Sequence, residues 1–231
     1  MFNKILKILS LDKTGFTLWM ISLGAVVGAF FFTSGNDFLS LLGTIIGVTS
    51  LIYLAKGYVI GQVLIIIFSL FYAVVSYKNQ YYGEMITYLF MTAPMAFIAL
   101  IQWMKNPYGE TNEVKVRSKL TTGHTIFLII SSILVTAIFY FILKVLGNAS
   151  LLVSTLSITT SYVAAYLTAA RVPYYALGYA LNDVVLIILW VAASIKSSEN
   201  IPLLVNFSVF LMNDLYGFIS CKKMEKRQKN I

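Results

Sequence analysis

The sequence predicts an all-α polytopic membrane protein with about eight transmembrane helices, and two observations favour this class. Hydrophobic residues make up 59% of the 231 residues and charged residues 11%, whereas a soluble domain is about half apolar and about a quarter charged. The apolar residues also form continuous blocks of about 20, the length of helix that crosses a bilayer core of about 30 Å. Strands of a transmembrane barrel would be segments of about ten alternating residues. A water-soluble globule and a barrel are therefore both disfavoured.

Eight apolar blocks lie between charged or turn-forming segments and predict eight spans. In chain order they are residues 16–34, 38–55, 57–77, 82–104, 124–146, 150–170, 174–196 and 201–220. Ahead of them, residues 1–14 place Phe2, Ile5, Leu6 and Leu9 on one helical arc beside lysines. This pattern predicts an amphipathic helix at the membrane interface. A signal peptide is not predicted, because no small-residue cleavage site follows.

The distribution of Lys and Arg predicts the orientation. In an eight-span arrangement, 14 of the 17 basic residues fall on one side, and only Lys78, Lys144 and Lys196 fall on the other. Because Lys and Arg accumulate on the cytoplasmic side, we expect a multi-pass protein of the cell membrane with both termini in the cytoplasm. The net charge of +8 indicates this orientation and attraction to anionic lipid. A nucleic-acid surface is not predicted, since the basic residues are scattered over loops.

A polar connection divides the spans into two groups. Residues 105–122 contain the turn-forming run Asn106-Pro107-Tyr108-Gly109. Spans two to four and six to eight are each three crossings, and span five links them, so both triplets enter from the same side as parallel repeats. The alternative is eight unrelated helices, because the two halves match weakly in sequence. The predicted units are an amphipathic N-terminus with an extra helix (1–37), a first three-helix bundle (38–104), a cytoplasmic loop with a linker helix (105–149), a second three-helix bundle (150–220) and a basic cytoplasmic tail (221–231).

Two aspartates lie inside predicted spans, where an ionisable side chain indicates a functional site. Asp183 follows Tyr174 by nine residues, about 14 Å of helix. Asp214 lies thirteen residues beyond Ile201, about 20 Å along its helix. Each aspartate directly follows an asparagine, so the pair Asn-Asp occurs once in each of the last two spans.

Other polar side chains share helical faces that should meet inside the bundle, because lipid cannot hydrogen-bond them. Span three supplies Gln62; span seven has Tyr179, Asn182, Asp183 and Trp190 within one arc; span eight has Asn206, Phe210 and Asn213 in a stripe with Asp214 on its flank. The serines and threonines of span six favour a packing role. So do three Gly-xxx-Gly pairs, Gly24/Gly28, Gly43/Gly47 and Gly57/Gly61. Trp103 is interpreted as an interfacial anchor.

The sequence predicts no cofactor and no metal site. With a single cysteine, Cys221, and a single histidine, His124, one chain offers neither a disulfide framework nor a cysteine or multi-histidine metal site. A cavity lined by the polar faces would present amides, hydroxyls, aromatic rings and carboxylates. Such a site suits a small, flat, polar or cationic molecule. Phosphate esters are disfavoured, because no Lys or Arg lies deep in a span.

Three stretches resemble the PnuC-type members of the Pnu vitamin-precursor transporter family. They are residues 81–107 (YYGEMITYLFMTAPMAFIALIQWMKNP), 179–190 (YALNDVVLIILW) and 206–218 (NFSVFLMNDLYGF). The resemblance implies uptake of nicotinamide riboside, a precursor of NAD, by facilitated diffusion. It also implies trapping by a cytosolic riboside kinase, a fold related to the SWEET sugar transporters with two three-helix bundles around a linker helix, and a homotrimer. The predicted substrate-binding residues are Gln62, Tyr179, Asn182, Asp183, Trp190, Asn213, Asp214 and Tyr216.

Several alternatives remain open at this point. Many relatives carry tryptophan near the end of the third helix of each triplet, whereas this chain has Trp103 in the first and none in the second. Thiamine or riboflavin is therefore an alternative cargo. Proton-coupled transport through Asp183 or Asp214 is a second alternative. A catalytic dyad of these two aspartates is disfavoured, because neither has a flanking glycine and no other catalytic motif occurs, so the protein is not expected to be an enzyme.

Overall fold

The computed structural model describes residues 11–32, 38–78, 82–148, 150–196, 198 and 201–230. The described residues are helical, apart from turns and two isolated β-bridges. The helices are α2 (Lys13–Phe32), α3 (Phe38–Ala55), α4 (Ile60–Lys78), α5 (Tyr82–Thr87), η1 (Tyr88–Thr92), α6 (Ala93–Met104), α7 (Thr122–Val145), α8 (Leu151–Ala169), α9 (Tyr175–Lys196) and α10 (Ile201–Lys229). Helices α5, η1 and α6 form one crossing, so eight helices are long and apolar enough to span a membrane. The predicted fold class is confirmed, whereas the amphipathic N-terminus falls largely outside the described residues.

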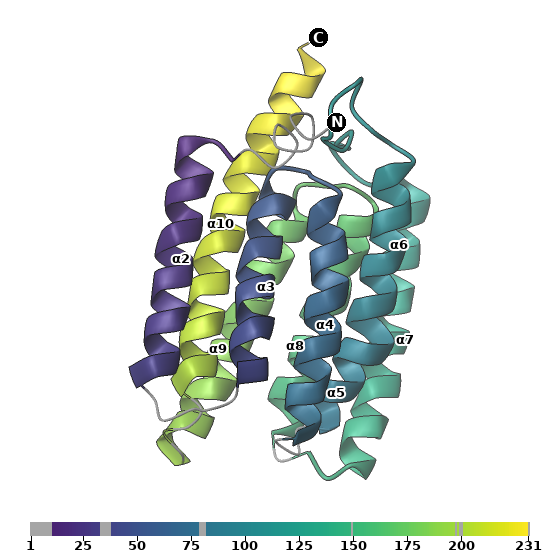
Figure 1. Ribbon diagram of the computed structural model, residues 1–231. Helices are drawn as coiled ribbons and strands as arrows, with labels where there is room; N and C mark the ends of the chain where they lie inside the picture. Colours follow the sequence, from purple (N-terminus) through teal and green to yellow (C-terminus); the bar gives the residue numbers. More distant parts are fainter. Residues whose placement is uncertain are drawn as a thin grey trace.

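The last helix differs from its predicted span. The prediction ends at residue 220, but α10 continues as one helix to Lys229, through the segment predicted as a basic tail. Ion pairs one helical turn apart stabilise this extension. Glu225 pairs with Lys222 at 2.6 Å and with Lys229 at 2.7 Å. The extension stands clear of the other helices at one end of the bundle, as Figure 1 shows.

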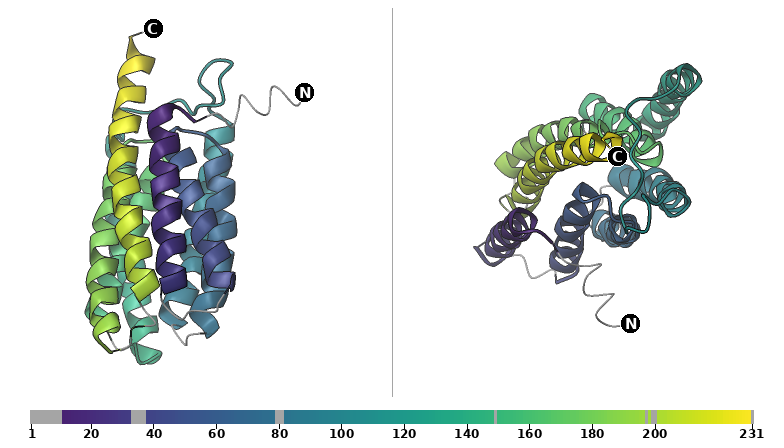
Figure 2. Two further views of the ribbon diagram at one scale, coloured as in Figure 1. Left: turned by 60° about the vertical axis from the view of Figure 1, so that its left-hand side comes forward. Right: turned by 90° about the horizontal axis from the view of Figure 1, so that it is seen from above.

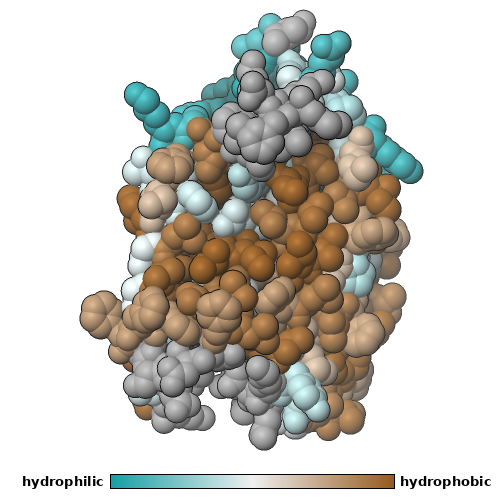
Figure 3. Space-filling view, in the orientation of Figure 1, coloured by the Kyte–Doolittle hydropathy of each residue, from teal (hydrophilic) through white to brown (hydrophobic). Residues whose placement is uncertain are grey.

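We name this end the C-terminal end of the bundle. Here α2 begins and α10 finishes (Figure 1), as expected for an even number of crossings. The connections 56–59, 105–121 and 170–174 also lie at this end. On the face that Figure 3 shows, the belt between the two ends is apolar, and hydrophilic side chains gather at the C-terminal end. The asymmetric distribution of basic residues in the sequence therefore corresponds to one end of the molecule.

Six crossings form a closed ring among the described residues. Contacts run from α3 to α4, from α4 to α6, from α6 to α8, from α8 to α9, from α9 to α10 and from α10 back to α3. Helix α2 packs outside the ring at the seam between α3 and α10, and α7 packs against α8. A view along the bundle axis shows this arrangement (Figure 2). The further division into two related triplets stays a prediction.

The fourth crossing contains a π-helical turn, η1, directly before Pro94. Proline lacks the backbone N–H that a helix interior needs, and its ring crowds the preceding turn. The wider π turn accommodates this break, with the N–H of Ala93 donating to the carbonyl of Tyr88. The helix therefore continues across the membrane and buries Tyr88 against the core of the ring and Met91 against α7 and α8. Such single π turns occur often at functional sites.

Candidate functional site

The interior of the ring holds buried polar side chains. Gln62 on α4, Asn182 and Asp183 on α9, and Asn206, Asn213 and Asp214 on α10 are each at most 6% exposed. Burying an amide or a carboxyl group is costly unless it finds a partner. The described residues include no buried Lys or Arg. The interior of the ring is therefore acidic and rich in amides, with no cation from the described residues.

The two aspartates meet. The carboxyl groups of Asp183 and Asp214 lie within hydrogen-bonding range of each other. Tyr179 lies within electrostatic range of both, and Tyr88 of the π turn lies within range of Asp183 and Tyr179. The polar faces of α9 and α10, which were expected to meet inside the bundle, thus approach each other at the two aspartates. Tyr88 also brings the fourth crossing to the same place, although it was not among the predicted site residues.

The two asparagines are held in the same way. Asn182 Oδ1 accepts hydrogen bonds from Ser157 Oγ at 2.9 Å and from Thr160 Oγ1 at 3.0 Å, both on α8. Asn213 Oδ1 accepts one from Ser22 Oγ on α2 at 3.2 Å. In both cases a hydroxyl group of a neighbouring helix donates to the amide oxygen. The hydroxyl face of α8, predicted as packing, therefore also positions Asn182.

Several buried polar atoms in the ring have no hydrogen-bond partner among the described residues. They are Gln62 Nε2, Asp183 Oδ2, both amide atoms of Asn206 and Asn213 Nδ2. More than about nine in ten buried polar groups in native structures are paired. Unpaired donors and acceptors on three helices of one ring indicate a place for a polar ligand or for ordered water. Asn206 belongs to this set, although it was not among the predicted site residues.

Aromatic side chains border the polar interior. Trp190 on α9 stacks on Phe207 of α10 with an angle of 6° between rings whose centroids are 6.5 Å apart. Phe207 in turn meets Tyr72 on α4, and Tyr72 lies 4.4 Å from Tyr88 between ring centroids. Phe207 and Tyr72 are absent from the predicted site. Phe207 directly follows Asn206 and lies in the stretch 206–218, and these were the signals available for it.

Tyr216 lies apart from this group. Lys56 Nζ sits 5.5 Å from the centre of the Tyr216 ring, and Lys56 also forms an ion pair with Asp12. Partial burial opposes the charge on Lys56, but its contacts with Asp12 and Tyr216 outweigh this effect and raise its pKa. Tyr216 therefore contributes to the C-terminal end of the bundle, and its role in substrate binding stays a prediction.

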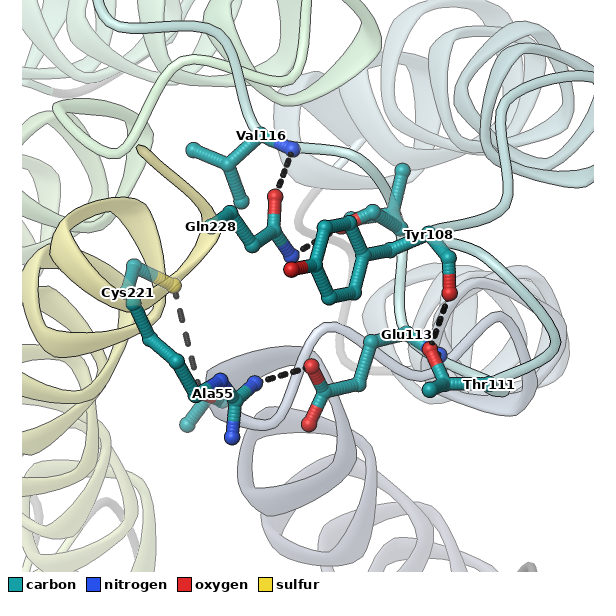
Figure 4. A network of polar contacts seen from close by, with 9 residues as sticks. Ala55, Tyr108, Thr111, Glu113, Val116, Cys221 and Gln228 are labelled. Atoms are coloured by element: carbon teal, nitrogen blue, oxygen red, sulfur yellow. Dashed lines mark hydrogen bonds and ion pairs between the residues drawn. The ribbon is translucent and has the colours of Figure 1, made fainter. Parts of the chain in front are cut away.

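The connection between α6 and α7 packs against the C-terminal end of the bundle. We call residues 105–121 the central loop. Figure 4 shows its residues Glu113 and Val116 beside Gln228 and Cys221 of α10. Gln228 Nε2 donates to the carbonyl of Val114 at 3.0 Å, and the N–H of Val116 donates to Gln228 Oε1 at 2.8 Å. Beneath this loop lies a cavity of about 10 Å³, lined by Trp103, Val114, Tyr175 and Cys221 among others. That volume holds about one water molecule and no nucleoside.

The chain is similar to known transporters along nearly its whole length. A family model described as Nicotinamide mononucleotide transporter matches residues 37–223. The nicotinamide riboside transporter PnuC of Neisseria mucosa is 27% identical over 216 residues, which cover 91% of this chain and 81% of that protein. The nicotinamide riboside transporter PnuC of Haemophilus influenzae is 25% identical over 193 residues, 83% of this chain and 82% of that protein.

The fold is also similar to a solved structure. The crystal structure of the vitamin B3 transporter PnuC superposes with a TM-score of 0.81 at 26% identity, covering 95% of this chain and 94% of that one. The resemblance noted in the three sequence stretches is confirmed. These relatives are named as transporters and not as enzymes, which agrees with the prediction that this chain is not an enzyme.

Proposed function

Because the chain belongs to the nicotinamide mononucleotide transporter family, we propose that it carries nicotinamide riboside across the membrane that its helices span. The observation that carries this proposal is the pair Asp183–Asp214 among unpaired buried amides. Nicotinamide riboside is a pyridinium cation with a carboxamide and ribose hydroxyls. Carboxylates complement the cation, and amides complement the carboxamide and the hydroxyls. The aromatic rings of Trp190 and Tyr179 offer flat surfaces for the pyridinium.

The charge of the ring interior favours binding of the riboside over binding of its phosphate ester. A mononucleotide would bring a phosphate group of about two negative charges into a ring that contains two carboxyl groups. The described residues offer no buried Lys or Arg to balance it, and an unpaired buried charge is strongly unfavourable. We therefore favour the riboside over the mononucleotide.

A binding screen tests the cargo. Detergent-purified protein is titrated with nicotinamide riboside, nicotinamide mononucleotide, thiamine and riboflavin by calorimetry. We expect the riboside to bind at least about 10-fold more tightly than the mononucleotide, since a buried unpaired charge costs several kcal/mol. Asn182→Ala and Asn213→Ala should each weaken riboside binding, and Ser69→Ala, which removes a hydroxyl bonded only to its own helix, should not. Tighter binding of another vitamin would overturn the riboside assignment.

The mode of transport is a second part of the proposal. We infer facilitated diffusion, with the riboside trapped by a cytosolic kinase and both termini in the cytoplasm. The contact between Asp183 and Asp214 keeps proton coupling as the alternative, because paired carboxyls in a low dielectric can exchange a proton. Liposomes distinguish the two modes. Equilibration of riboside without a pH gradient supports diffusion, whereas uphill uptake driven by an imposed gradient and lost in Asp214→Asn supports coupling.

A further inference from the structure

Helix α2 reaches the polar interior of the ring from outside it. Ser22 on α2 is 3% exposed, and its hydroxyl donates to Asn213 Oδ1 through the seam between α3 and α10. Trp19 Nε1 donates to Thr49 Oγ1 on α3 at 3.1 Å, which fixes the same helix to the other side of the seam. The family model begins at residue 37, so α2 lies outside the residues that it matches.

The hydrogen bond from Ser22 engages the oxygen end of the Asn213 amide. An amide carries an acceptor oxygen on one side and two N–H donors on the other. With the oxygen occupied by Ser22, the nitrogen is the end that remains buried and without a partner. Asn182 shows the same polarity, because two hydroxyls of α8 occupy its oxygen. The Asn213 amide nitrogen is therefore a free N–H donor for a ligand.

We propose that Ser22 is a positioning residue that orients the Asn213 amide as a hydrogen-bond donor to an acceptor oxygen of the substrate. This inference rests on the proposed function, since it assumes that Asn213 contacts the cargo. Helix α2 then contributes, through Ser22, to the substrate specificity of the transporter. Ligand acceptors, such as a carbonyl or a ribose oxygen, face the asparagines, while ligand cations and donors face the aspartates.

The test compares Ser22→Ala with Ser22→Thr and with the matched control Ser69→Ala, whose hydroxyl bonds only to the carbonyl of Ile65. Binding is measured by calorimetry with nicotinamide riboside, or with the vitamin that the unmodified protein binds in the screen. KM and maximal rate are measured in liposomes. We expect Ser22→Ala to raise Kd and KM about 5- to 30-fold with the maximal rate unchanged. Ser22→Thr, which keeps the hydroxyl, should stay within about 3-fold of the unmodified protein.

The outcomes separate this inference from the proposed function. Failure of the unmodified protein to bind the riboside overturns the cargo and leaves the comparison of variants intact with the true ligand. An unchanged Kd in Ser22→Ala overturns the positioning role. So does a Kd raised equally in Ser22→Ala and Ser22→Thr, because the effect then comes from packing and not from the hydroxyl.

A second inference rests on different contacts, at the C-terminal end of the bundle. Val114 of the central loop is 2% exposed and inserts between the helices. Its N–H donates to the carbonyl of Gly57 at 2.9 Å, and its carbonyl accepts from Gln228. Beside it, Glu113 forms an ion pair with Arg227. The central loop is therefore bonded both to the extension of α10 and to the connection between α3 and α4.

We infer that the central loop is a latch that closes the C-terminal end and that Gln228 holds it shut. The residues beneath it include Cys221, the only cysteine in the chain, which is 2% exposed. Opening of this end requires Val114 to withdraw from its place beside Gly57. Withdrawal exposes Cys221, so the rate at which this thiol reacts reports the opening of the latch.

The test follows labelling of Cys221 by a membrane-impermeant maleimide in right-side-out and inverted vesicles. Gln228→Ala removes both side-chain hydrogen bonds and should speed labelling about 5-fold or more. Lys226→Ala, an exposed position on the same extension, should leave the rate unchanged. Labelling should occur only from the side that carries the C-terminus. Equal rates in the two variants, or labelling only from the opposite side, would show that the loop is not a latch.

Discussion

Asp183→Asn is expected to weaken the binding of nicotinamide riboside at least about 30-fold while changing the binding of its neutral dihydro form less than about 3-fold. The side chain is 3% exposed and its Oδ2 atom has no partner among the described residues. A cation that enters this interior loses its hydration shell, and the carboxylates are the charged groups of the protein that can replace it. Asparagine keeps the size of the side chain, removes the charge and replaces one acceptor oxygen with an N–H donor.

The magnitude follows from the burial of the pair. Removing one partner of a buried, hydrogen-bonded ion pair typically costs about 3–5 kcal/mol. The neighbouring Asp214 retains part of the attraction, so we use about 2 kcal/mol, which is about 30-fold in Kd. The neutral dihydro form has the same shape and no ring charge, and it therefore controls for altered packing.

The stability of the variant should change in the opposite direction. Two buried carboxyl groups in contact are unfavourable for folding. Burial removes both groups from water, and their negative charges repel each other when both are ionised. Asp183→Asn should therefore raise the thermal unfolding midpoint of the ligand-free protein, as is common when a functional group is removed from a binding site. Glu110→Gln, an exposed position in the central loop, is the control for the loss of one negative charge. Equal weakening of the cationic and neutral ligands would contradict a role for Asp183 in charge recognition.

The membrane-spanning helices could be predicted closely because hydrophobic length alone determines them. The block 38–55 coincides with α3, and 82–104 coincides with the crossing from α5 to α6. The π turn before Pro94 could not be predicted. A proline indicates that a backbone hydrogen bond is missing, but it does not indicate which helix geometry accommodates the loss. The length of α10 was missed because its last turns are polar and are stabilised by ion pairs instead of lipid.

Side-chain environments were harder to predict than spans. Trp103 was interpreted as an interfacial anchor, but it is 1% exposed and donates to the carbonyl of Thr168 on α8. A tryptophan near the end of a span can face headgroups or a neighbouring helix, and composition does not distinguish the two. The close packing predicted for Gly24 and Gly28 is not seen, because a Cβ at either position meets no described atom within 4 Å. Gly47 does pack closely, against Phe68 and Phe210.

Part of the candidate site could be predicted because ionisable side chains are costly in hydrocarbon. Asp183 and Asp214 lie within predicted spans, and such groups face the interior of the bundle because lipid cannot hydrogen-bond them. The contributions of Ser22, Tyr88 and Phe207 depend on which helices become neighbours. That information lies in the packing of the ring and not in the local sequence.

A second large effect, on stability, is expected from substitution of Gly178 on α9, where this helix packs against α8. A Cβ placed there would lie 2.9 Å from the Cβ and 3.0 Å from the Cα of Ala164 on α8. A backbone atom cannot rotate away, so α8 and α9 must separate. We expect Gly178→Ala to lower the thermal midpoint and Gly178→Val to yield no monodisperse protein on size-exclusion chromatography, at a cost of about 3 kcal/mol or more.

A glycine-to-alanine substitution at Gly24 should change the thermal unfolding midpoint in the opposite direction. Alanine is favoured over glycine in a helix interior by about 0.5–1 kcal/mol, and at Gly24 no described atom opposes it. Gly24→Ala should therefore leave the midpoint unchanged or raise it. Separation of α8 from α9 also lengthens the bonds from Ser157 and Thr160 to Asn182, so Gly178→Ala should weaken ligand binding as well. A Gly178→Ala protein as stable as Gly24→Ala would mean that α8 and α9 do not approach as closely as this packing requires.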